Sequence, residues 1–212
     1  IKLYFMIGLP TETVDDVEGI VHIVDRIRRE TRKSPPRLRI SVSTFVPKAH
    51  TPFQWVAQDS QDDLKAKHDI LRRGLGRAKA HLSWEDPETS LLETILARGD
   101  RRLGRVIHHA WKSGATFDAW SERFNYDRSL NAFDKEGVDP DFYAHRRLPL
   151  DETLPWSHID VGVSPDFLKE EYERTFQGTQ TPDCRTRCSS CGLEVREGIC
   201  QVSRGDGDSN RT

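Results

Sequence analysis

The sequence lacks any long hydrophobic run. No apolar stretch among its 212 residues approaches the ~18 residues that a membrane-spanning helix needs. Residues 1 to 10 are apolar but are interrupted by Gly8 and Pro10, and they lack the small-residue cleavage site of a secretory signal. We therefore expect a cytoplasmic protein with no membrane partner.

The sequence also lacks an excess of charge of one sign. It has 32 basic and 34 acidic residues, a net charge of −2 and a pI of about 6.5. A protein that binds nucleic acid through its overall charge would show a strong basic excess, so only a local basic patch remains compatible with that role. Charged residues make up 31 % of the chain and mean hydropathy is −0.68, which predicts much surface helix and loop.

Several enzyme fingerprints are missing. The sequence has no G-x-G-x-x-G, no Walker lysine, no nucleophile elbow and no H-E-x-x-H. Dinucleotide binding, P-loop phosphate binding and a stand-alone hydrolase are therefore unsupported.

Cysteine is absent from the first 183 residues. A disulfide-stapled secreted protein would spread its cysteines through the fold, so their late grouping favours a local metal site. The spacing is C-x3-C-x2-C-x8-C, and four thiolates can close a structural zinc site or carry an iron–sulfur cluster. Gly192 fits the tight turn of a metal knuckle, and four free thiols are the alternative. The predicted metal ligands are Cys184, Cys188, Cys191 and Cys200.

The N-terminal residues read as a strand, a helix and a second strand. Residues 2 to 9 form a continuous apolar run typical of a buried parallel strand. Thr13 is a good N-cap for a helix over 14–30, and residues 38 to 46 alternate as a second strand. Two strands cannot form a stable parallel sheet alone, so we expect further strands from a preceding part of the protein.

From residue 60 to 177 the patterns predict helices and loops without a strand. Ser60 caps a long charged helix, Pro87 starts the next one, and Ser164-Pro165 starts the last. Trp111, Trp120 and Phe124 are predicted to be core residues. The expected helices cover 60–82, 87–99, 100–112, 116–124, 127–137, a short one from 139, and 164–176.

Two stretches end strands in ways that suit ligand binding. In FMIGLPTET, Gly8 allows a tight turn at the carboxyl edge of a parallel sheet, where α/β proteins bind ligands. A simple strand–turn–helix joint is the alternative reading. In STFVPKAHTPFQW, prolines and aromatics make a rigid loop in which Phe53 and Trp55 form a hydrophobic lid and His50 is structural.

Together these stretches resemble a known family. The phrases YFMIGLPTET and VSTFVPKAHTPFQW are similar to the last two strands of radical SAM enzymes that carry an N-terminal cobalamin-binding domain. RGDRRLGRVIHHAW, FDAWSERF, LPWSHIDVGV and TPDCRTRCSSCG agree with the same family, so the resemblance covers about residues 1 to 200. It implies the last βα units of a partial TIM-type barrel, followed by a mainly helical extension with a cysteine cluster.

The resemblance also implies cofactors. The full protein would cleave S-adenosylmethionine reductively at a 4Fe–4S cluster, and cobalamin would allow methyl transfer or another radical step. The cluster loop, the first strands and the cobalamin domain would lie before Ile1, so the missing N-terminal part is the first partner and this chain alone would be inert. The substrate is unknown, with RNA or protein compatible. The residues that would line the adenosyl site are Met6, Gly8, Leu9, Pro10, Glu12, Thr44, Phe45 and Val46.

The remaining predictions concern candidate site residues in the middle of the sequence and the division of the chain into segments. His158 and Asp160 are candidate catalytic residues in LPWSHID, and Arg101, Arg102 and Arg105 form a solvated face or touch a phosphate. We expect barrel strands over 1–58, a helical extension over 59–180, a metal or cluster segment over 181–202 and a disordered tail over 203–212. The alternative function is a helical zinc-knuckle module that binds RNA or a protein partner.

Overall fold

The computed structural model describes residues 1–193, which fold into two compact units. One unit comprises Ile1–Lys48 and Val56–Leu148, and the other comprises Ala49–Trp55 with the described residues from Pro149 onward. The predicted segments 1–58, 59–180 and 181–202 are continuous runs of chain, whereas each compact unit combines runs that are distant in sequence. Cys200 and the tail over 203–212, predicted to be disordered, lie outside the described residues.

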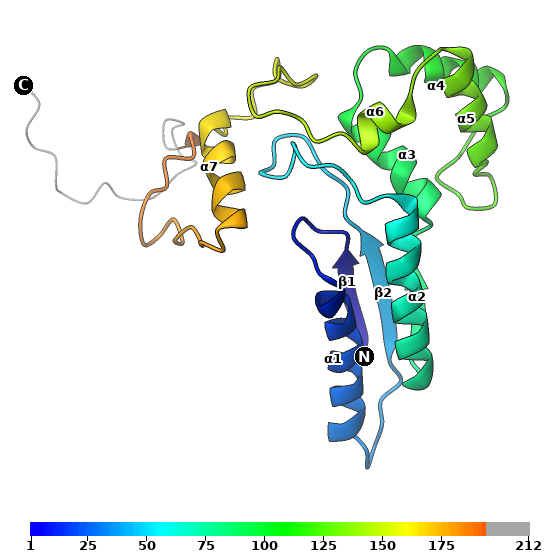
Figure 1. Cartoon of the computed structure of the whole chain (residues 1–212), viewed down its shortest axis with the longest axis vertical. Helices are drawn as coiled ribbons and strands as arrows, with labels where there is room; N and C mark the ends of the chain where they lie inside the picture. The colour runs from blue at the N-terminus through cyan, green and yellow to red at the C-terminus, as the bar shows by residue number, and fades with distance from the viewer. Residues whose placement is uncertain (194–212) are drawn as a thin grey trace, which may run out of the picture. The chain divides into compact units, whose positions relative to one another are not determined.

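Three parallel strands form the sheet of the first unit, in the order β1, β2, β3. They span Lys2–Ile7, Arg39–Thr44 and His81–Trp84. Helix α1 (Val14–Glu30) connects β1 to β2, and α2 (Gln61–Arg77) lies between β2 and β3. Figure 1 shows both helices alongside β1 and β2. Because Ile7 pairs with Thr44, the carboxyl ends of the first two strands lie side by side.

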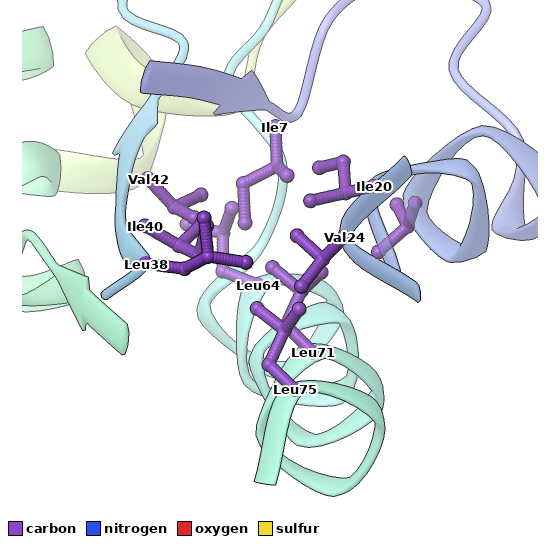
Figure 2. Packing of buried hydrophobic residues seen from close by; sticks show 10 residues of the cluster. Ile7, Ile20, Val24, Leu38, Ile40, Val42, Leu64, Leu71 and Leu75 are labelled. Carbon is purple, nitrogen blue, oxygen red and sulfur yellow. The ribbon is translucent and has the colours of Figure 1, made fainter. Parts of the chain in front are cut away.

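The core of this unit lies between one face of the sheet and the two helices (Figure 2). Side chains alternate along a strand, so Ile7, Ile40 and Val42 point to the helices while Tyr4 and Met6 lie on the other face, 71 % and 46 % exposed. The helices contribute apolar residues at the spacing predicted from sequence. The buried helical residues are Val17, Ile20, Val24, Leu64, Leu71 and Leu75.

The predicted partial TIM-type barrel is wrong. The described residues form a small α/β unit whose three-stranded sheet is open, with seven helices over residues 1–193. A TIM barrel closes eight parallel strands around a packed interior. Here β1 ends the strand order on one side, and Tyr4 on the face away from the helices is exposed, so no barrel interior is formed by the described residues.

The strand β3 was missed because a helix was predicted through residue 82. The helix α2 ends at Arg77, where Lys79 takes a left-handed φ of 51° and the Ala80 N–H donates to the Leu75 carbonyl. Residues 81 to 84 then pair with β2. Four residues carry little local signal, so the pairing with β2 decides their conformation.

Four further helices of the first unit share a second core. They are α3 (Pro87–Arg98), α4 (Leu103–Lys112), α5 (Tyr126–Lys135) and α6 (Pro140–Ala144). In the other unit, α7 (Pro165–Phe176) begins at the predicted cap Ser164. The caps predicted at Thr13 and Ser60 are confirmed, and so is Pro87 as the start of a helix.

Two predictions in this helical region are wrong. Residues 116 to 124 form turns and not a helix. Trp111 and Trp120 are 59 % and 62 % exposed, and Phe124 is half-buried, so they are not core residues. The helical spacing that suggested a common face does not apply, because the chain leaves the helix after Lys112.

None of the helices within residues 1–193 is long and apolar enough to cross a membrane.

Candidate functional site at the carboxyl end of the sheet

The turn between β1 and α1 is built around Gly8. Its φ of 83° is a left-handed conformation that disfavours other residues, and a Cβ there would lie 3.3 Å from the Asp59 Oδ2. The Gly8 N–H donates to the Glu12 Oε1 at 3.0 Å, and the Glu12 N–H donates to the Leu9 carbonyl at 3.0 Å. The turn is therefore held from within by the backbone and side chain of Glu12.

An ionic cluster fixes this turn to the start of α2. The Lys67 Nζ lies 2.6 Å from the Glu12 Oε1 and 2.5 Å from the Asp59 Oδ2, and the three side chains are 15 %, 7 % and 29 % exposed. Burial lowers the pKa of the Lys67 ammonium, but the hydrogen bonds and charges of Asp59 and Glu12 outweigh it, so the pKa is raised. Lys67 therefore carries a full positive charge between two carboxylates.

Sequence reasoning did not find Asp59 and Lys67. Asp59 directly precedes the helix cap Ser60, and Lys67 lies within the charged segment that was predicted to be a helix. In the sequence both therefore resemble ordinary surface charges. What distinguishes Lys67 from a surface charge is its ion pair with Glu12, which lies 55 residues earlier in the chain. The β1–α1 turn brings Glu12 to this position.

The structure brings the predicted adenosyl-site segments together. Residues 6–12 and 44–46 are adjacent because β1 and β2 pair in parallel and the Phe45 N–H donates to the Ile7 carbonyl at 2.8 Å. Met6 lies on the exposed face of the sheet, with Leu9 exposed and Pro10 half-buried in the turn. These residues surround the carboxyl end of β1.

The three candidates on β2 lie differently. Thr44 is 5 % exposed, lies on the face that packs against the helices, and has a hydroxyl without a hydrogen-bond partner in the described structure. Phe45 is buried, and its carbonyl accepts from the Gln58 Nε2 at 3.3 Å; Val46 is half-buried. Among the predicted adenosyl-site residues, the exposed apolar side chains are therefore Met6, on the open face of β1, and Leu9, in the turn that follows.

The cysteine segment does not form a metal site in the described residues. Cys184 and Cys188 are exposed and Cys191 is half-buried, and the residues up to 193 contain no group of three or more histidine, cysteine or acidic side chains placed to bind a metal. Cys200 lies outside the described residues. Gly192 takes the left-handed φ of 98° expected of a tight turn, and a Cβ there would lie 2.8 Å from the Gly162 carbonyl.

A hollow of about 420 Å³ in the second unit contains one of the two catalytic candidates. Asp160 lines it together with His50 and Trp156, whereas His158 is exposed and does not line it. The Asp160 Oδ1 accepts from the Gly162 N–H at 2.7 Å, and the Gln54 Oε1 accepts from the His50 N–H and the Trp156 Nε1. These contacts order two loops, and they do not pair His158 with Asp160.

The three arginines predicted to form a solvated face or to touch a phosphate lie at and around the start of α4. Arg102 is held by Asp100 at 2.7 Å and lines a hollow of about 340 Å³ with Arg105 and Glu136. The hydrogen bond from Arg102 lowers the pKa of the Asp100 carboxyl. Arg101 is exposed, as predicted for a solvated face.

No protein-family model matches the chain, and no solved structure matches it. The chain is similar to an uncharacterised protein of Methanocaldococcus jannaschii, with 30 % identity over 138 residues. The match covers 65 % of this chain and 30 % of that protein, so the chain spans about a third of the length of the curated relative it matches.

Proposed function

We propose that this chain is part of a longer, cobalamin-dependent radical SAM enzyme and contributes the adenosyl-facing edge of its parallel sheet. The observation that carries the proposal is the adjacency of the Gly8–Glu12 turn and the Thr44–Val46 strand end at one carboxyl edge. This is the edge where open parallel sheets bind ligands. The family phrases in the sequence and a curated relative much longer than the chain support it.

The residues at this edge fit an adenosyl group. Met6 is 46 % exposed on the open face of the sheet and provides an apolar surface, and Leu9 is exposed in the turn that follows the strand. S-adenosylmethionine would supply, on reductive cleavage at a 4Fe–4S cluster, the radical that abstracts a hydrogen atom from the substrate. This chain's part is to shape the turn, through Glu12 held by Lys67, and to keep water from the adenosyl face.

The cluster itself requires residues beyond this edge. Residues 1–58 contain no cysteine, so the three ligands of the catalytic cluster would come from another part of the protein. In this proposal the catalytic cluster is not held by this chain, so the isolated chain would be inert, and methylation or a related modification would belong to the full protein. We place that protein in the cytoplasm, where thiols and iron–sulfur clusters stay reduced.

The test is a titration of the 212-residue chain with S-adenosylmethionine, followed by NMR. We expect amide shifts confined to residues 6–12 and 44–46, with an affinity of about millimolar because only part of the ligand is contacted. Met6→Lys places a cation beside a cationic ligand and weakens binding about tenfold, or about 1.4 kcal/mol.

Leu96→Lys is the matched control. Leu96 is 47 % exposed, nearly the same as Met6, but lies on α3 and outside residues 6–12 and 44–46, so this variant should bind like the parent chain. Shifts that miss the sheet edge, or equal weakening by both variants, would refute the proposal.

A further inference from the structure

A basic hollow lies at the opposite end of the sheet from the candidate adenosyl edge. Helices α1 and α2 both follow strand carboxyl ends, so their own C-termini meet at the amino ends of the strands (Figure 1). There a hollow of about 580 Å³ is lined by five basic residues and by Asp25. The basic residues are Arg28, Arg29, Arg32, Arg77 and Lys79.

Arg28 lines this basic hollow and is hydrogen-bonded to three backbone carbonyls. Its guanidinium donates to the carbonyls of Pro36, Ala78 and Lys79, at 2.9, 3.1 and 3.1 Å. These bonds tie the end of α1 to the following loop and to the end of α2. Because all three acceptors are neutral carbonyls, the charge of Arg28 is oriented but not neutralised.

The other four cations have no carboxylate partner in the described structure. Within residues 1–193 no ion pair involves Arg29, Arg32, Arg77 or Lys79, whereas the nearby Arg26 and Arg72 are paired with Glu30 and Asp69. The two helix C-termini supply about −0.5 charge each, and Asp25 supplies one more negative charge. The hollow therefore keeps a surplus of about three positive charges, more than helix-dipole stabilisation requires.

The lining indicates which anion would fit. No aromatic side chain of the described residues lines the hollow, so a base has nothing to stack on. Ala78 is the one apolar residue among those that line it, so the hollow offers little for insertion into a bilayer. Guanidinium groups recognise phosphate through paired hydrogen bonds. A nucleic-acid strand carries one phosphate charge per ~3.4 Å, a density that matches several cations crowded in one hollow.

We propose that this basic hollow binds the sugar-phosphate backbone of a nucleic acid without reading its bases. The site is separate from the proposed adenosyl edge, and its test does not depend on enzymatic activity. The net charge of −2 means that binding depends on this local patch and not on overall attraction.

The experiment measures binding of a fluorescent single-stranded RNA oligonucleotide to the 212-residue chain by anisotropy at several salt concentrations. The double variant Arg32→Ala/Arg77→Ala removes two exposed cations and leaves the structural Arg28 in place. We expect at least about tenfold weaker binding and a salt slope lower by about 1.4, since each lost phosphate contact on a single strand is worth about 0.7.

The matched control is Arg26→Ala/Arg72→Ala. It removes one exposed arginine from α1 and one from α2, both already paired with acids outside the hollow, and should change neither affinity nor slope. Circular dichroism verifies that all variants are folded.

Three results would overturn the proposal: unchanged RNA binding in the Arg32/Arg77 variant, an equal loss in the control, or tighter binding of anionic vesicles or a poly-glutamate peptide than of RNA. A DNA strand of the same length should bind comparably, because the contacts are to phosphate.

Discussion

At the scale of single residues, Lys67 is the side chain on which the candidate edge depends. It neutralises Glu12, which in turn holds the Gly8 N–H, so one ammonium supports the whole turn. Glu12 and Asp59 would be left as two uncompensated, partly buried carboxylates if this charge were removed. Removing one partner of a buried ion pair destabilises a protein by much more than the intact pair stabilises it.

Lys67→Met should lower the free energy of unfolding by about 3 kcal/mol. Urea denaturation measures this change. Lys65→Met is the matched control on the same helix, because Lys65 is 62 % exposed and pairs only with the exposed Asp62 at 3.6 Å. Its expected cost is below about 1 kcal/mol. Equal effects of the two substitutions would show that the cluster does not stabilise the turn.

The same cluster predicts a dependence on alkaline pH. Because the folded pKa of Lys67 is raised above 10.5, the unfolded chain loses this proton first as the pH rises. The folded state then binds more protons, so stability present below 10.5 declines as the pH approaches the folded pKa. Lys67→Met should lack this part of the decline.

At the scale of elements, the packing of α1 against α2 depends on Gly74. A Cβ at this position would lie 2.5 Å from the Val21 Cγ2 and 2.7 Å from the Cγ1, so both helices would have to move apart. The two glycines of α2 look alike in sequence, where each merely weakens a helix. Of the two, only Gly74 has a neighbouring side chain, that of Val21, which leaves no room for a Cβ.

Gly74→Ala should therefore destabilise the chain by about 1 to 2 kcal/mol, because the overpacking cost exceeds the gain in helix propensity. Gly76→Ala is the control, since nothing lies within 4 Å of its Cβ position, and it should stabilise the chain by about 0.5 kcal/mol. Thermal unfolding of both variants measures the difference. A stabilising Gly74→Ala would mean that α1 and α2 are less closely packed than described.

At the scale of the whole molecule, metal binding distinguishes the radical SAM enzyme from the alternative function, a helical zinc-knuckle binding module. Only the intact chain contains all four thiols, because Cys200 follows the described residues. A radical SAM role favours an iron–sulfur cluster at the cysteines, whereas the helical binding module favours zinc. Among the described residues Cys184 and Cys188 are exposed free thiols.

Anaerobic purification of the whole chain followed by metal analysis tests this choice. A brown protein with iron and sulfide, colourless in the Cys188→Ala variant, supports the enzyme. One tightly bound zinc per colourless chain supports the binding module, and absence of both metals leaves neither metal proposal standing.

The sequence by itself determined the features that depend on neighbours along the chain. The first two strands follow from apolar runs of residues that suit a pleated sheet. Helix starts at Thr13, Ser60 and Ser164 follow from side chains that cap their own helices. The nearness of the Gly8 turn to Thr44 also followed, because a βαβ unit places two strand ends at one edge.

Only the tertiary structure decided what depends on distant partners. The four residues of β3 form a strand because β2 pairs with them, and the sheet of the described residues stays open where a barrel had been predicted. Trp111 is exposed because no element covers that side of α4 among the described residues. The Glu12–Lys67–Asp59 cluster and the basic hollow each join charges from separate segments, and such proximity exists only after the chain has folded.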